Sequence, residues 1–182
     1  MKRTIIFTLV TCVAAAIIVG CTRTDTGPTK GKGPDPKVSA EAKAKYLLAD
    51  EPAGAKGVIE FKKAAKDGEE VVVVGRIGGS EKPFTGRAAF TIVDVKFKAC
   101  SDIEGDNCPT PWDYCCEAPE ELAKGTVLVK LVDSAGKTAP DDAKALLDLK
   151  ELQTIVVRGQ ARRDESSSIS VVASGIYIKK KK

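Results

Sequence analysis

The sequence predicts a mainly β domain of the α+β class, a five-stranded Greek-key barrel behind a helical lead-in, with a cysteine-rich insertion between strands two and three. Three observations predict this fold. Runs with strand periodicity recur five times after residue 69, and one helical segment separates the third run from the fourth. Glycines also interrupt three of the runs, where a small barrel needs sharp coiling.

Residues 39–68 have the apolar spacing of helices and form the predicted lead-in. Ser39 is a suitable N-cap for a first helix, which Glu51-Pro52 ends. A second short helix is expected over residues 55–66, with Asp67-Gly68 as its stop.

Residues 69–178 form the predicted barrel. A helix with acidic residues in its first turn is expected from Pro140 to Leu149, between the third and fourth strands. In the second strand, alternation places Phe90, Ile92 and Asp94 on one face. The five strands are expected over 71–77, 89–97, 126–132, 154–162 and 168–178, with Gly75, Gly159 and Gly175 inside them.

Three strands, a helix and two further strands follow the order of the OB-fold. The run 71–77 followed by 90–94 resembles the first hairpin of bacterial OB-fold domains, and the pattern extends over residues 70–178. The alternative is another small barrel or a sandwich. OB-folds bind oligonucleotides and oligosaccharides on the face of strands two and three, so either ligand is an alternative function. Basic residues that could lie on this face are Arg76, Lys96, Lys130, Arg158 and Arg162.

Residues 1–20 have the features of a secretory signal peptide: Lys2-Arg3, a short apolar run and a small residue before Cys21. Ile18-Val19-Gly20-Cys21 resembles the bacterial lipobox. The resemblance implies that Cys21 is lipidated and becomes the membrane-anchored N-terminus. A cleaved soluble protein and an uncleaved anchor are the alternatives.

Residues 21–38 are rich in Thr, Gly, Pro and Lys, and we expect a flexible tether after the lipidated cysteine. Thr22, rather than Asp, follows Cys21. In the lipoproteins that the motif resembles, Asp at this position retains the protein in the inner membrane. The resemblance therefore implies a lipid-anchored envelope protein, in the outer membrane rather than the inner, facing the periplasm or the exterior.

The formal net charge of +4 belongs to the ends of the chain rather than to its body. Residues 38–178 contain 19 basic and 23 acidic residues, whereas the tether and the tail, 179–182, are basic. A body with net negative charge disfavours nucleic-acid partners. The chain has no histidine and no Gly-rich phosphate loop, which excludes histidine-dependent catalysis and haem attachment through Cys-x-x-Cys-His. We expect no enzymatic activity and no cofactor.

Residues 98–124 form a cysteine-rich, acidic loop that contains Cys100, Cys108, Cys115 and Cys116. In an exported chain, an even number of clustered cysteines predicts two disulfides. Adjacent cysteines pair poorly with each other, so Cys100 and Cys108 are the expected partners of the other two, in either order. The alternatives are a four-thiolate metal site or a redox centre, although the paired Cys-x-x-Cys motifs of both are missing.

The same loop contains seven acidic residues and no basic residue between Lys98 and Lys124. The spacing of Asp102, Glu104 and Asp106 is that of a calcium loop, but Asn107 stands where such a loop needs Gly. We therefore expect these acidic side chains to be solvated, with calcium binding as the alternative.

Trp112 and Tyr114, stiffened by neighbouring prolines, are the candidate contact residues for a partner. The alternative is that Trp112 packs over the cysteines as a local core. The sequence therefore predicts a membrane-anchored, non-catalytic binding module with a possible envelope protein partner. A small cysteine-based metal-binding or redox protein is the main alternative.

Overall fold

The computed structural model describes residues 34–180. The predicted signal peptide, Cys21, most of the predicted tether and the last two lysines lie outside the described residues. Within residues 34–180, no helix combines the length and the apolar character needed to cross a membrane.

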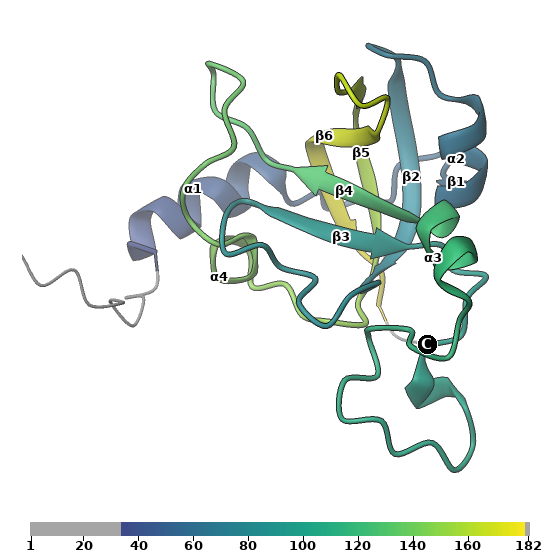
Figure 1. The fold of residues 1–182 in the computed structure, drawn as a ribbon. Helices are drawn as coiled ribbons and strands as arrows, with labels where there is room; N and C mark the ends of the chain where they lie inside the picture. Colours follow the sequence, from purple (N-terminus) through teal and green to yellow (C-terminus); the bar gives the residue numbers. More distant parts are fainter. Residues whose placement is uncertain (1–33, 181–182) are drawn as a thin grey trace, which may run out of the picture. The chain divides into compact units, whose positions relative to one another are not determined.

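Five strands close into a barrel, and their order confirms the predicted OB-like fold (Figure 1). The strands are β2 (Glu70–Ile77), β3 (Ala89–Val93), β4 (Thr126–Lys130), β5 (Thr154–Arg163) and β6 (Ile169–Ile178). Around the barrel they run β2-β3-β4-β6-β5, and β5 pairs with β2 to close the circle. The β4–β6 pair is parallel and the other four barrel pairs are antiparallel. The short strand β1 (Lys56–Gly57) adds to β2 in parallel.

Two of the strand glycines allow neighbouring strands to approach closely. A Cβ atom on Gly159 would lie 2.2 Å from the carbonyl oxygen of Val172, beside a shift in the register between β5 and β6. A Cβ atom on Gly75 would lie 2.8 Å from the carbonyl oxygen of Val93. Neither distance is compatible with a larger residue, so Gly75 and Gly159 are required where neighbouring strands approach closely.

β3 ends four residues earlier than predicted, at Val93. The side chain of Asp94 is buried, with 1% of its surface exposed, and it accepts hydrogen bonds from the backbone N–H groups of Ile59 (2.8 Å) and Lys96 (3.0 Å). The Asp94 carboxylate therefore caps the helix α2 (Val58–Ala64) and turns the chain away from the sheet. The prediction that the strand continues through Asp94, on one face with Phe90 and Ile92, is wrong because Asp94 lies beyond the end of β3.

A single hydrophobic core fills the barrel. Strand residues such as Val73, Phe90, Ile92 and Val129 are fully buried in it. The helix α4 (Ala143–Leu147), between β4 and β5, contributes Leu146 and Leu147. A helix at this place in the chain was predicted, although the observed one is shorter than 140–149.

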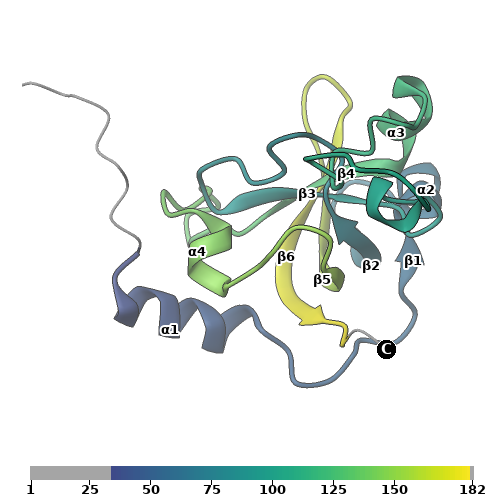
Figure 2. The same cartoon turned by 90° about the horizontal axis from the view of Figure 1, so that it is seen from below.

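The helical lead-in packs against the barrel through α1 (Pro36–Tyr46), which lies beside α4 and β6 (Figure 2). Asp35 caps α1, so the helix begins three residues before the predicted start, and the predicted tether is correspondingly shorter. Ser39 is not the cap. Its hydroxyl donates instead to the carbonyl of Leu146 (2.9 Å), and the Tyr46 hydroxyl donates to Val132 (2.8 Å).

The second helix of the lead-in, α2, buries Val58 and Phe61 as its apolar spacing predicts. It is shorter than the predicted 55–66 because residues 56–57 pair with β2 as β1. α2 contacts a helix that was not predicted, α3 (Pro119–Gly125), and the ammonium group of Lys62 donates to the carbonyls of Ala123 (2.6 Å) and Thr126 (2.8 Å).

Candidate functional site: the cysteine-rich loop

The cysteine-rich loop, defined as residues 98–118, connects β3 to α3 and extends beyond the end of the barrel (Figure 1). Its regular structure is one short 3₁₀ turn at Cys100–Asp102. The predicted insertion between the second and third barrel strands, β3 and β4, is confirmed. Its last part is the helix α3, so the irregular segment ends before Pro119.

A small hydrophobic cluster holds the loop against the barrel. Val93, Ala99 and Tyr114 are each 0% exposed and pack together, separately from the main core. The half-buried residues Phe97, Leu122 and Leu152 complete this cluster. The prediction that Tyr114 offers an exposed contact surface is therefore wrong: its ring is the largest fully buried side chain of the described residues.

Backbone and polar contacts add to this docking. The Trp112 indole donates to the carbonyl of Glu81 (3.0 Å), and the Gly79 N–H donates to the carbonyl of Trp112 (2.8 Å). Arg76, on the outer side of β2, pairs with Asp102. Burial opposes the charge on Arg76, but the hydrogen bond that its guanidinium donates to Asp102 keeps the pKa of Arg76 above its ordinary value. Trp112, which is half-buried, thus contributes to docking of the loop.

Gly78 permits the close approach of the loop. A Cβ atom at this position would lie 2.5 Å from the carbonyl oxygen of Trp112 and 2.9 Å from the Tyr114 ring. In the sequence, Gly78 is followed by Gly79 and Ser80 and fits an ordinary turn. Its contact partner lies more than thirty residues away in the chain, and no local pattern indicates such a contact.

Tyr114 carries two unfavourable features at once. Its φ is +60°, a left-handed conformation that is strained for a bulky residue. Its hydroxyl is buried and, among the described residues, has no hydrogen-bond partner. Burial raises the pKa of Tyr114 above its usual value, with the charge of nearby Arg76 acting in the opposite direction. The left-handed turn places Asp113 and Cys115 on either side of this buried residue.

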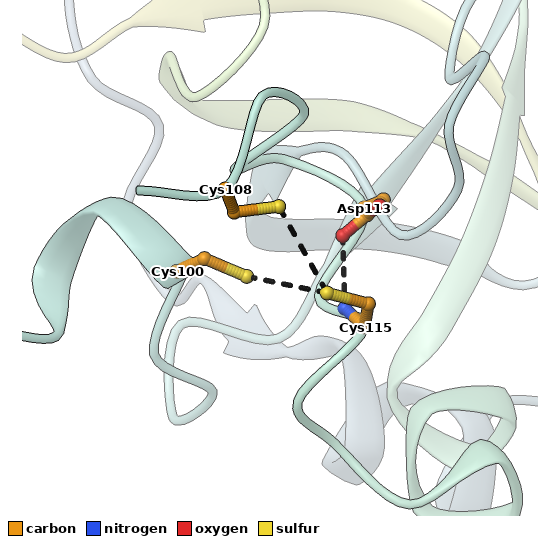
Figure 3. A group of neighbouring side chains, drawn as sticks. All are labelled: Cys100, Cys108, Asp113 and Cys115. Atoms are coloured by element: carbon orange, nitrogen blue, oxygen red, sulfur yellow. Dashed lines mark hydrogen bonds between the residues drawn. The ribbon is translucent and has the colours of Figure 1, made fainter. Parts of the chain in front are cut away.

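The sulfurs of Cys100, Cys108 and Cys115 gather beside Asp113 (Figure 3), and the sulfur of Cys116 lies near that of Cys100. The Sγ atom of Cys100 lies 3.8 Å from that of Cys115 and 3.9 Å from that of Cys116. The Sγ atoms of Cys108 and Cys115 are 3.9 Å apart. Cys100 is buried, Cys108 is half-buried, and Cys115 and Cys116 are exposed. All four are thiols in this structure, and the predicted disulfides are not present in it.

Two acidic residues hold the backbone of the sulfur cluster. Asp113 accepts from the Cys115 N–H (2.9 Å) and from the Thr110 hydroxyl (2.8 Å). Asp106 accepts from the Cys108 N–H (2.8 Å). Asp113 also belongs to the cluster itself, because one carboxylate oxygen and the sulfurs of Cys100, Cys108 and Cys115 all lie within 4.8 Å of one another. A second group joins Cys100, Asp106 and Cys116.

The electrostatics of the cluster favour neutral thiols beside an ionised carboxylate. Burial raises the pKa of Cys100, while hydrogen bonds with Cys100 and Asp113 raise the pKa of Cys115. Burial opposes the charge on Asp113, but the hydrogen bonds from Cys115 and Thr110 lower the pKa of Asp113 below its ordinary value. A protonated thiol is a poor nucleophile. The raised pKa values of Cys100 and Cys115 therefore give no support to the redox alternative.

The calcium alternative receives no support either. Asp102 turns toward Arg76, and Asp106 and Asp113 turn toward the cysteines. The groups of potential metal ligands found among residues 34–180 contain neither Asp102 nor Glu104. The acidic residues therefore do not converge as a calcium loop requires.

The loop also changes the surface on which OB-folds bind ligands. Val93 points outward from β3, opposite to the inward-facing Ile92, and it is fully buried under the loop cluster. Arg76, one of the basic residues predicted to decorate this face, is paired with Asp102. The loop thus covers the outer face of β3, the second barrel strand, at the end where Val93 lies.

No family model matches this chain, and no curated protein matches it. Among solved structures, the chain is similar to the hypothetical protein ygiW from E. coli, with 15% sequence identity, coverage of 70% of this chain and 94% of that chain, and a TM-score of 0.38. The strand order and pairing described above define the molecule as an OB-like barrel protein.

Proposed function

We propose that the protein is a lipid-anchored, non-catalytic binding module of the bacterial envelope, in which the barrel holds the cysteine-rich loop as a rigid platform for a protein partner. The similarity of residues 18–21 to a lipobox supports the anchor. The absence of histidine from the chain supports a function without histidine-dependent catalysis.

The observation that carries the binding proposal is the docking of the loop. Val93 of β3 is fully buried beneath the loop, and Tyr114 of the loop is fully buried against it. The loop is therefore ordered before any partner arrives. Ordering a loop on binding costs conformational entropy, and a loop that is already packed avoids most of this cost. An irregular loop that served only to connect β3 to α3 would not need its own hydrophobic cluster.

The chemistry of the loop surface indicates a partner with a basic contact surface. Ile103 is 39% exposed, which is unusual for a large apolar residue in this structure, and the exposed acid Glu104 follows it. The loop has no basic residue after Lys98. An apolar contact surrounded by acidic groups complements a protein surface of opposite charge.

Anchoring and partner binding are tested separately. The wild-type chain should incorporate radioactive palmitate, and replacement of Cys21 by Ser should abolish this labelling. A wild-type chain that takes up no label, or a Cys21→Ser variant that still takes it up, would refute the lipid anchor. Because the loop is remote in sequence from Cys21, this result does not depend on the partner.

For the partner, a photo-crosslinking residue at position 103 in the full-length chain should capture a discrete protein in intact cells. Capture counts as support only if Glu104→Lys weakens it and if Glu165→Lys, an exposed acid on the β5–β6 turn, does not. Equal effects of the two substitutions, or capture that is insensitive to salt, would contradict a specific acidic contact.

The structure gives less support to oligosaccharide or single-stranded nucleic-acid binding by the barrel. Part of the usual face is covered at Val93, and residues 38–178 contain more acidic than basic residues. Saturable binding of either ligand at moderate salt, lost on replacing Lys130 and Arg158, would favour this alternative.

A further inference from the structure

We propose that the sulfurs of Cys100, Cys108 and Cys115 and the carboxylate of Asp113 form a tetrahedral binding site for one zinc ion, with Cys116 outside the ligand set. This site goes beyond the envelope binding role and is independent of both the lipid anchor and the partner. It differs from the four-thiolate alternative drawn from the sequence, because Asp113 takes the place of one cysteine.

The first argument is the spacing of the ligand atoms. Zinc–thiolate bonds of about 2.3 Å in a tetrahedral site place neighbouring sulfurs about 3.8 Å apart. The observed Sγ separations are 3.8 Å for Cys100 and Cys115 and 3.9 Å for Cys108 and Cys115. A disulfide brings the same atoms to about 2.0 Å. Two of the three sulfur pairs therefore lie at the separation that a shared ion requires, and the third pair, Cys100 and Cys108, lies within 4.8 Å.

The second argument is convergence. The ligand atoms of all four residues lie within 4.8 Å of one another, although the residues span positions 100–115. Cys100 and Cys108 point toward Cys115 from separate segments of the loop (Figure 3). A pair of cysteines that served only one disulfide would not need a third sulfur and a carboxylate at the same place.

The third argument is the chemistry of the donors. Thiolate sulfur selects soft or borderline ions, and zinc accepts three sulfurs and one carboxylate oxygen. Calcium would need six or more oxygen ligands, which this cluster does not offer. The nearest residues in the sequence supply no positive charge, since residues 99–123 contain no Lys or Arg. A bound divalent cation would favour the deprotonated thiols and compensate the Asp113 charge.

The fourth argument is that hydrogen bonds from neighbouring backbone and side-chain groups hold the ligand residues in position. The backbone N–H of Cys100 donates to the Pro111 carbonyl (3.2 Å), and the N–H of Cys115 donates to Asp113 (2.9 Å). The Thr110 hydroxyl donates to the other Asp113 oxygen. Carboxylates that ligate metals are commonly oriented by such outer hydrogen bonds, and each oxygen keeps a lone pair for the ion.

The competing arrangement is a specific pair of disulfides. The sulfur contacts join Cys100 to Cys115 and Cys116, and Cys108 to Cys115. The pairing that follows these contacts and uses all four cysteines is Cys100–Cys116 with Cys108–Cys115. This pairing would consume all three proposed thiolate ligands, so zinc and the two disulfides exclude each other.

The test uses the full-length chain extracted in detergent. Its zinc content is measured by atomic absorption, and its free thiols are counted by alkylation with and without a chelator in denaturant. We expect one zinc per chain and thiols that react fully only after chelation and unfolding. A cobalt titration of the reduced, zinc-free protein should show thiolate charge-transfer and tetrahedral d–d absorption that saturates at one equivalent. A metal-free chain with two disulfides that binds no cobalt after reduction would overturn the proposal.

Adjacent cysteines provide a matched pair of variants. Cys115→Ser should abolish stoichiometric zinc and the cobalt spectrum, whereas Cys116→Ser should retain both. Asp113→Asn should weaken zinc binding at least tenfold, since loss of even outer-shell partners costs about ten- to a hundredfold in metal affinity. Circular dichroism confirms that each variant is folded. Equal loss of zinc in Cys115→Ser and Cys116→Ser would refute this ligand set, because disulfides or a four-cysteine site would need both residues.

Discussion

Replacing Tyr114 by Phe removes a buried hydroxyl that has no hydrogen-bond partner among the described residues. The ring would stay in the loop cluster with Val93 and Ala99, since the substitution changes only the polar atom. An unsatisfied buried polar group costs about 1–3 kcal/mol. We therefore expect Tyr114→Phe to raise the free energy of unfolding by about 1 kcal/mol, which corresponds to about 2–4 °C in Tm for a domain of this size.

Tyr46→Phe is the matched control, because the Tyr46 hydroxyl is in a good hydrogen bond with the Val132 carbonyl (2.8 Å). Its loss should lower the free energy of unfolding by about 1 kcal/mol, so the same chemical change should act with opposite signs at the two sites. Thermal unfolding followed by circular dichroism and by differential scanning calorimetry measures both. If Tyr114→Phe destabilises the protein as much as Tyr46→Phe does, the Tyr114 hydroxyl has a partner and the reasoning fails.

Two further predictions concern the docking of the loop and the acid stability of the barrel. Gly78→Ala places a methyl group 2.5 Å from the Trp112 carbonyl oxygen and should destabilise the protein by about 1–3 kcal/mol. Proteolysis within residues 98–118 should become faster, and unchanged proteolysis would contradict close docking of the loop. The hydrogen bond from Lys144 (2.5 Å) lowers the pKa of Glu151 in the folded state despite partial burial. The unfolded chain therefore binds this proton first as the pH falls, so the stabilisation is present above about pH 4.5 and is lost below it. Glu151→Gln should reduce the loss of stability between pH 6 and pH 3 by at most about 1 kcal/mol in urea titrations, and an unchanged pH profile would refute this contribution.

The barrel was predictable because its signals are local. Alternating β-branched residues indicate each strand, and the helix between the third and fourth strands distinguishes this order from a simple meander. The positions of Gly75 and Gly159 also follow from the barrel geometry, since each faces a neighbouring strand without room for a side chain. Periodicity and small residues record such constraints directly in the sequence.

The errors in the fold prediction involve contacts that are distant in the chain. Asp94 fits a strand pattern by alternation, but α2, more than thirty residues earlier, supplies the N–H group of Ile59 that draws its carboxylate out of the sheet. Ser39 is a good N-cap by local rules, yet Asp35 caps the helix and Ser39 binds Leu146, more than a hundred residues away. In both cases a tertiary hydrogen bond overrides a local preference.

The site was predictable in its location and composition but not in its arrangement. The cysteines, the acids and the aromatic residues of the loop are visible in the sequence, whereas the direction of each side chain depends on how the loop folds back on β3. Tyr114 was expected to face a partner, and it is instead buried because Val93 and Leu152 provide an apolar surface for its ring. Asp113 is one of seven acidic residues of this segment in the sequence, and the structure places it with the cysteines.

Tyr114 connects the stability of the loop with its proposed chemistry. Its left-handed conformation costs of order 1–3 kcal/mol, and its unsatisfied hydroxyl adds a comparable cost at the same residue. Strain of this kind persists only where the surrounding structure holds it. The buried ring holds Tyr114 from the inside, and a zinc ion bound by Asp113 and Cys115 would hold the flanking residues from the outside. Removal of the ion should therefore loosen this turn before it affects the barrel, because the barrel core does not include the loop cluster.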